Sequence, residues 1–174
     1  MLAGIYHLNV FCRPSMLWKD GQVERARLLP AAIVASWDKQ SMDVVVLHEV
    51  FDAACQKIFE EEFKARGYLH VIKEIPGVFV GSGTMIFSRV PISNVRHTRY
   101  NKSSGVERLA SKGVICCRLH FPGSTRCVVL AATHMSAWQG DRQAQRAQLN
   151  SFVCDYCKCL EQKKTIVVIV GDLN

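Results

Sequence analysis

Residues able to bind a metal ion or a phosphate stand at the ends of four apolar segments of the chain. Asn9 lies late in the first segment, and Glu49, His134 and Asp172 each follow an apolar, largely β-branched run. Asn174 stands two residues beyond Asp172. In α/β sheets, ligands gather at strand ends because side chains meet there on rigid supports. The pattern therefore predicts one polar site assembled from four separate segments.

These residue types indicate phosphoryl chemistry. Glu49 and Asp172 offer the hard oxygen ligands that Mg²⁺ prefers, and His134, Asn9 and Asn174 could bind a phosphate oxygen. A metal ion with polar donors neutralises the charge that builds on a phosphoryl group under attack. Each residue alone has an ordinary explanation, since a strand-end Glu is usually solvated and a lone His or Asn often caps a turn. Only the joint pattern favours a catalytic site.

Alternating helix and strand patterns must position these residues. Helical periodicity predicts three helices, at 22–39, 52–66 and 141–161. Apolar runs separated by Gly, Pro or Ser predict eight strands, at 3–11, 43–48, 68–73, 82–88, 92–100, 113–121, 126–133 and 165–170. This order predicts a layered α/β fold in which two sheets pack together and helices lie outside.

Several local signals refine these elements. Asp52 is a suitable N-cap for the second helix, and Gly67 is a suitable stop. The run 43–48 is typical of a strand buried on both faces, and the run 165–170 suits a buried strand as well. The segment 81–83 (GSG) lacks the lysine and the following helix of a phosphate loop, so it predicts a tight turn.

Composition narrows the class of protein. The chain has 174 residues, of which 49% are hydrophobic and 21% charged, as in globular domains. No apolar run reaches the roughly 18 residues of a spanning helix, and the N-terminus shows no secretory signal. The spacing of the eight cysteines matches no zinc finger and favours free thiols in a reducing compartment. The net charge of +7 suits an anionic partner without choosing among nucleic acid, phospholipid and phosphate ester.

Five motifs in this order resemble the endonuclease/exonuclease/phosphatase superfamily, which has the DNase I-like fold. They are Asn9, LHEV (47–50), GSGTMIFSRVPI (81–92), ATHMSAW (132–138) and VVIVGDLN (167–174). The resemblance runs the whole length of the chain. It implies an α/β/β/α sandwich of two packed, mostly antiparallel sheets with outer helices.

Three further segments resemble the neutral sphingomyelinase branch of that superfamily. They are DGQVERA (20–26), SKGVICCRL (111–119) and HMSAWQGDRQAQRAQL (134–149). The middle segment carries a Lys-Gly pair where nuclease relatives usually show an Asp/Glu-Gly-Arg element. The resemblance implies a peripheral membrane or cytoplasmic enzyme, with secretion left open if the natural chain begins upstream.

The resemblance also implies roles for individual residues. Glu49 is the expected principal ligand of Mg²⁺, for which Mn²⁺ or Co²⁺ could substitute, and Asn9 is expected to support that metal. His134 is expected to contact the scissile phosphate, Asp172 to orient the attacking water, and Asn174 to bind a phosphate oxygen.

Two basic residues and one aromatic residue are weaker candidates for binding substrate. Lys112 and Arg108 could attract an anionic headgroup, although a solvated loop explains them better. Trp138 could line a lipid entrance, or it could pack partly into the core.

The superfamily also uses a late Asp-His pair, whose His serves as general base or acid. No histidine of this sequence stands in a matching motif. We therefore expect residues 1–174 to form a single, incomplete domain that lacks its last strands and is inactive alone. Loss of a general base typically costs about 10²–10⁴ in rate.

The function expected of the family is Mg²⁺-dependent hydrolysis of sphingomyelin to ceramide and phosphocholine. Two alternatives stay open within the superfamily, a DNase I-like nuclease acting on nucleic acid and an inositol-phosphate phosphatase. A third alternative is a non-catalytic, truncated remnant.

Overall fold

The fold of the chain comes from a computed structural model that describes residues 4–17, 19–36, 42–73, 81–105, 109–160 and 165–174. Its strands are β1 (Gly4–Cys12), β2 (Met42–Val50), β3 (His70–Ile72), β4 (Met85–Ser88), β5 (Ile92–Arg99), β6 (Gly113–Leu119), β7 (Cys127–His134) and β8 (Thr165–Asp172). Its helices are α1 (Gln22–Ala35), α2 (Ala53–Ala65) and α3 (Gln139–Lys158).

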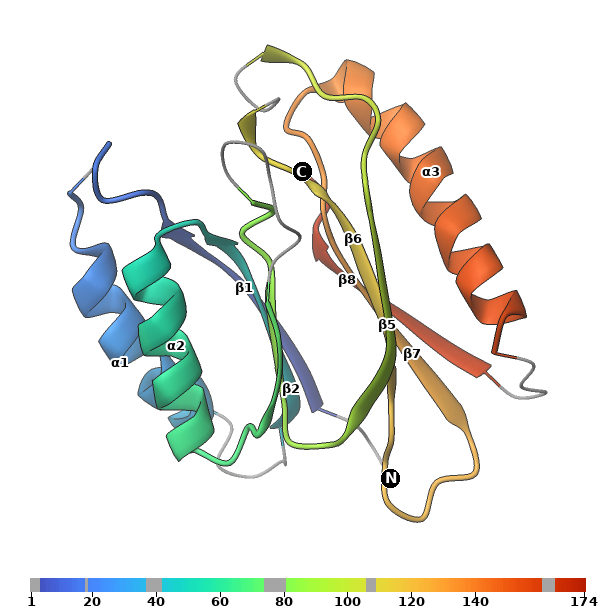
Figure 1. Ribbon diagram of the computed structural model, residues 1–174, viewed down its shortest axis with the longest axis horizontal. Coiled ribbons are helices and arrows are strands. Elements are labelled where there is room, and N and C mark those ends of the chain that lie inside the picture. The colour runs from blue at the N-terminus through green and yellow to red at the C-terminus, as the bar shows by residue number, and fades with distance from the viewer. Residues whose placement is uncertain (1–3, 18, 37–41, 74–80, 106–108, 161–164) are drawn as a thin grey trace.

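Two four-stranded sheets pack face to face, and the helices cover their outer faces (Figure 1). The strand order is β1-β2-β4-β3 in the first sheet and β5-β6-β7-β8 in the second. Helices α1 and α2 lie on the first sheet, and α3 lies on the second. The predicted α/β/β/α sandwich is confirmed.

The central strands of this sandwich bury both of their faces. On β2, Val45 and Leu47 pack toward α1 and α2, whereas Val44 and Val46 pack between the two sheets. Side chains alternate between the faces of a strand, so an unbroken apolar run fills two cores at once. The prediction of a strand buried on both faces at 43–48 is confirmed.

Each sheet contains one parallel pair of strands. Strand β1 runs parallel to β2 and β7 runs parallel to β8, whereas the other four pairs among the described strands are antiparallel. The carboxyl ends within each parallel pair therefore lie at the same end of their sheet. Because β8 also contacts β1 and β2 across the sandwich, all four carboxyl ends come together.

The observed elements differ from the predicted ones mainly at their ends. Helix α1 ends at Ala35 rather than at residue 39, and residues 37–39 lie outside the described part of the chain. Residues 68 and 69 precede β3 instead of belonging to it, because the Tyr68 N–H donates back to the Phe63 carbonyl of α2 at 3.1 Å. Strand β4 begins at Met85, since the backbone before it bonds outside the strand ladder, with the Gly83 carbonyl accepting from the Val50 N–H at 2.9 Å.

The prediction that the run 165–170 forms a buried strand is wrong. Strand β8 is an edge strand, and Val167 and Ile169 are 40% and 44% exposed. Among the described strands only β7 pairs with β8, and α3 packs over β6 instead. The strand therefore leaves an apolar flank exposed.

All eight cysteines are free thiols, five of them buried. No helix in the described ranges has the length and apolar character needed to cross a membrane.

Candidate active site

The parallel pair β1 and β2 contributes Asn9 and Glu49. Asn9 pairs in register with His48, so its side chain lies beside the end of β2. The Asn9 amide donates to the Glu49 carboxylate at 2.9 Å. This hydrogen bond fixes one acidic side chain at the carboxyl end of the first sheet.

An unusual backbone torsion directs Glu49 into the site. Leu47 and Val50 both pack on the helix side of the first sheet, so the regular alternation of β2 is interrupted between them. The interruption falls at Glu49, whose φ of +61° is rare for a residue with a side chain. Such torsions are costly and cluster at functional sites. The left-handed turn is what places the carboxylate between the two sheets.

The parallel pair β7 and β8 contributes His134 and Asp172. The two residues are register partners at the ends of their strands. Inward-facing residues alternate regularly along both strands, which places His134 and Asp172 on the face toward the first sheet. Gly171 has a φ of +151°, and a Cβ at this position would overlap the carbonyl oxygen of Thr133. Only glycine therefore lets the end of β8 approach β7 this closely.

The four side chains surround a small volume without saturating one another. The Asn9 amide nitrogen also donates to the Asp172 carboxylate, at 3.0 Å. The His134 Nε2 atom lies 3.9 Å from a Glu49 oxygen and 4.0 Å from an Asp172 oxygen. These distances allow attraction between charges but exceed a hydrogen bond. The predicted convergence of Asn9, Glu49, His134 and Asp172 is confirmed.

Asp172 is held in its charged form. Partial burial acts to raise its pKa, but the Asn9 hydrogen bond, the charge of His134, the Asn174 backbone N–H and the charge of Lys112 together hold that pKa below its ordinary value. The Asn174 N–H donates to the carboxylate at 3.2 Å. Asp172 is therefore a carboxylate at neutral pH.

The arrangement fits a divalent cation. Ligand atoms of Glu49, His134 and Asp172 all lie within 4.8 Å of one another, and two carboxylates converge on a single amide nitrogen. Two neighbouring negative charges favour a cation between them, and carboxylate oxygens suit Mg²⁺. Rotation of the Asn9 amide by about 180° would present its oxygen instead of its nitrogen to that cation, since the two ends of an amide have the same shape.

Lys112 is buried rather than solvated, which corrects the loop explanation of this residue. Only 7% of it is exposed, and its Nζ donates to the Met135 carbonyl at 3.0 Å, next to His134. The Asn174 side-chain amide donates to the same carbonyl at 2.9 Å. Both groups are therefore held at the margin of the site, while Arg108 lies outside the described residues.

Trp138 is 57% exposed and takes the N-cap position of α3. The prediction of partial core packing therefore fails for most of this side chain. Its indole lies beside Gly105, where an added Cβ would meet the Trp138 Nε1 at 3.6 Å.

Sequence reasoning missed two histidines beneath the site. His48 is fully buried, its ring centroid lies 5.4 Å from that of His134, and its Nδ1 lies 3.0 Å from the Thr84 hydroxyl. The ring of His7 lies 4.9 Å away on the other side of His48. Burial, assisted by the charges of His134, His7 and Lys112, holds the pKa of His48 well below its usual value. The sequence did contain a signal for His48, because this residue directly precedes Glu49 in a strand predicted to be buried.

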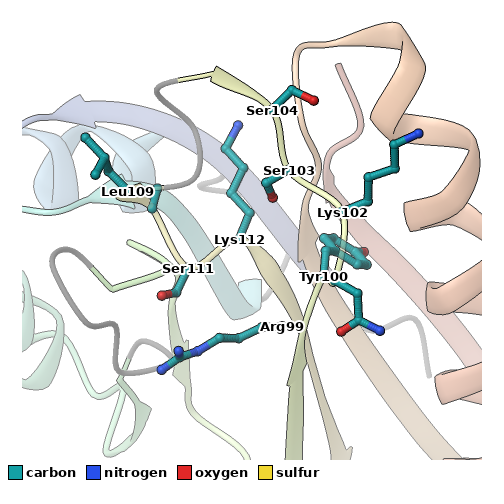
Figure 2. Close-up of a pocket in the computed structure, with 10 residues that line it drawn as sticks. Arg99, Tyr100, Lys102, Ser103, Ser104, Leu109, Ser111 and Lys112 are labelled. Atoms are coloured by element: carbon teal, nitrogen blue, oxygen red, sulfur yellow. The ribbon is translucent and has the colours of Figure 1, made fainter.

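A cavity of about 560 Å³ borders the site and shares Lys112 with it. It lies between the segment after β5 and the segment before β6. Figure 2 shows Lys112 and Ser103 extending toward each other across this space, whereas Lys102 points toward α3. There the Lys102 Nζ donates to the Gly140 carbonyl at 3.0 Å. The lining is rich in hydroxyls and cationic side chains, namely Arg99, Lys102, Ser103, Ser104, Ser111 and Lys112.

Comparisons with known proteins agree with this architecture. Sphingomyelinase C from Streptomyces griseocarneus superposes with a TM-score of 0.80 at 23% identity, over 99% of this chain and 63% of that one. A Staphylococcus aureus beta toxin with bound magnesium ions superposes with a TM-score of 0.79 at 22% identity, over 97% of this chain and 63% of that one. The fold is DNase I-like, as in the sphingomyelinases.

Similarity in sequence points to the same group of proteins. Human sphingomyelin phosphodiesterase 3 is 26% identical over 166 residues, which cover 81% of this chain and 25% of that protein. No protein-family profile matches the chain. The chain thus spans about a quarter of its curated relative and under two thirds of the two sphingomyelinase-like structures. The predicted resemblance to the superfamily and to its sphingomyelinase branch is confirmed.

Proposed function

We propose that this chain carries the metal- and phosphate-binding half of a Mg²⁺-dependent phosphodiester hydrolase acting on a sphingomyelin-type phospholipid. The observation that supports it is the convergence of Asn9, Glu49, His134 and Asp172 at the ends of two parallel strand pairs. The similarity to sphingomyelinases in fold and sequence favours the lipid substrate. In the reaction, water attacks phosphorus and gives up a proton, the bond from phosphorus to the ceramide oxygen breaks, and the departing ceramide oxygen takes up a proton, which leaves ceramide and phosphocholine as products.

Each side chain has a role that follows from its position. Glu49 would hold the cation with support from Asn9, and Mg²⁺ bound there would supply charge neutralisation at the phosphate. His134, on the opposite sheet, contacts the scissile phosphate. Asp172, ionised at neutral pH, accepts a hydrogen bond from the attacking water and orients it.

The margin of the site suits the phosphate rather than the choline. Lys112 and the amide of Asn174 both donate to the Met135 carbonyl, next to His134, so a cationic donor and an amide donor stand at the margin where a phosphate would bind. The cationic lining of the 560 Å³ cavity would repel a quaternary ammonium. The choline group therefore lies away from this cavity.

Calorimetric titration of Mg²⁺ tests the metal site directly. We expect the chain to bind Mg²⁺ and Glu49→Gln or Asp172→Asn to weaken that binding by at least about tenfold, since the first removes the charged ligand and the second removes the negative charge beside it. Glu61→Gln, an exposed substitution on α2, serves as the control and should leave the affinity unchanged. Absence of Mg²⁺ binding by the unaltered chain would overturn the proposal.

Parallel substrate assays separate the alternatives. Mg²⁺-dependent release of phosphocholine from sphingomyelin in mixed micelles, lost in Glu49→Gln, supports the lipid substrate. Nicking of plasmid DNA without phosphocholine release would favour a nuclease instead. Binding of Mg²⁺ with cleavage of neither substrate would agree with the expectation that the proton-transfer pair is missing, and it would favour the non-catalytic alternative for this chain.

A further inference from the structure

A turn directly after β1 holds large apolar side chains out in the solvent. Met16 and Leu17 are 88% and 63% exposed, and Phe11 just before the turn is 51% exposed. We infer that this apolar turn, residues 11–17, inserts into the surface of a lipid bilayer and docks the site on it. The inference rests on the proposed function and adds the surface through which the enzyme reaches a membrane-bound substrate.

The exposure of the apolar turn is built into the fold. The Leu17 N–H donates to the Pro14 carbonyl and the Ser15 N–H donates to the Asp52 carboxylate, both at 2.9 Å. Asp52 also accepts from the first turn of α2, so the apolar turn is tied to a packed helix. Phe11 has a φ of +53°, which turns its side chain away from the core. An ordered turn that displays adjacent apolar side chains marks a surface that meets an apolar partner.

The apolar turn lies at the same end of the sandwich as the site. It starts two residues after Asn9, and the Phe51 N–H just beyond β2 donates to the Cys12 carbonyl at 2.9 Å. Figure 1 shows the ends of β1, β7 and β8 at the same end of the sandwich. Beyond the ends of β7 and β8, Trp138 and Leu173 are also exposed. Apolar side chains therefore flank the site on both sheets.

The charges around the apolar turn suit a lipid surface. The segment from residue 11 to residue 25 carries Arg13, Lys19 and Arg25 against Asp20 and Glu24, which is one net positive charge, and Arg13 and Arg25 both pair with Asp20. Apolar side chains beside a weakly cationic segment suit a membrane interface, where apolar groups insert and cations meet phosphate.

Co-flotation with vesicles of phosphatidylcholine and sphingomyelin tests this docking. We expect the chain to partition onto the vesicles, and the double substitution Met16→Ser/Leu17→Ser to lower the partition coefficient about tenfold or more, since each side chain loses apolar area that would leave water. Leu69→Ser is the matched control, because Leu69 is 66% exposed but stands beside Tyr68, whose hydroxyl binds the first residue of β2 at the opposite end of the sheet.

Further variants separate docking from the metal site. Glu49→Gln should lose Mg²⁺ affinity and keep vesicle binding, whereas Met16→Ser/Leu17→Ser should keep Mg²⁺ affinity. The inference is overturned if the unaltered chain does not bind vesicles, or if Leu69→Ser lowers binding as much as the double substitution. It is also overturned if binding requires phosphatidylserine, disappears at high salt and ignores the double substitution, because docking would then be electrostatic.

Discussion

Two backbone positions with unusual torsions decide where the acidic side chains of the site point. Glu49 takes a φ of +61°, which turns its carboxylate between the sheets, and Gly171 takes +151°, which brings Asp172 beside His134. A left-handed residue with a side chain costs of order 1–3 kcal/mol. The Asn9 amide, which donates to both carboxylates, helps to offset that cost.

At the residue scale, Gly171→Ala should disrupt the end of β8. The added Cβ would overlap the Thr133 carbonyl, so β8 must shift, and we expect a loss of about 3 kcal/mol in the free energy of unfolding. Chemical denaturation measures this loss, and Mg²⁺ titration should show weaker binding because Asp172 moves with the strand. Gly140→Ala in α3, where a Cβ meets nothing, is the control and should stay within about 0.5 kcal/mol of the unaltered chain. Equal stability of the two variants would refute the account of β8.

At the element scale, Asp52 links helix α2 to the apolar turn. Its carboxylate accepts from the backbone N–H groups of Ala54 and Cys55 at the start of α2 and from that of Ser15 in the turn. Burial acts to raise the pKa of Asp52, but the hydrogen bonds from Ser15 and Cys55 lower it below its ordinary value. One side chain thus stabilises a helix start and orders the segment that we propose to meet the bilayer.

This link predicts a stability difference that depends on pH. Asp52→Ala should lower the free energy of unfolding at neutral pH by about 1–2 kcal/mol, the usual cost of a lost N-cap. A depressed pKa in the folded state means that the stabilisation is complete above the ordinary pKa of 3.8 and disappears as the pH falls through the folded-state value. Urea titrations at several pH values should therefore show the difference between the two proteins shrinking in acid.

Asp52→Asn is the control for that experiment, because its side-chain oxygen still accepts hydrogen bonds. It should recover most of the stability, and its difference from Asp52→Ala should not depend on pH. A constant difference between the unaltered chain and Asp52→Ala down to acid pH would contradict an ionised Asp52.

At the scale of the whole molecule, the second sheet ends in an exposed edge strand, β8. The sandwich buries its strands between helices and sheets, but the edge strand β8 leaves Val167 and Ile169 exposed on the outer face. An exposed apolar edge strand can pair with another chain. The exposed face of β8 is therefore a surface through which two chains can associate.

We predict that the 174-residue chain self-associates through β8. Sedimentation velocity should show association that grows with concentration, and Val167→Lys/Ile169→Lys should reduce it, because charges on an edge strand oppose pairing. Val95→Lys is the control, since Val95 is 46% exposed on β5 at the opposite edge of the same sheet. A monodisperse chain that melts cooperatively as a monomer would show the prediction to be wrong.

Much of the fold was accessible from the sequence because its signals are local. The β-branched run before Glu49 predicted a strand buried on both faces, and Asp52 and Gly67 marked the start and stop of α2. The alternation of strands and helices predicted the sandwich. The order of short motifs led to the candidate residues, since polar groups at strand ends are visible without coordinates.

The amino-acid sequence by itself determined which side chains stand at the ends of four strands and which chemistry they can perform. Only the tertiary structure decided that Asn9 bridges Glu49 and Asp172, that Lys112 is buried, and that β8 is an edge strand. The physical reason is that the periodicity of apolar residues shows which face of a segment is buried, but it does not show which other segment packs against that face. Contacts between residues far apart in the chain decide which strands are parallel and which edge strand is covered. They also decide where an unusual φ turns a carboxylate into the site.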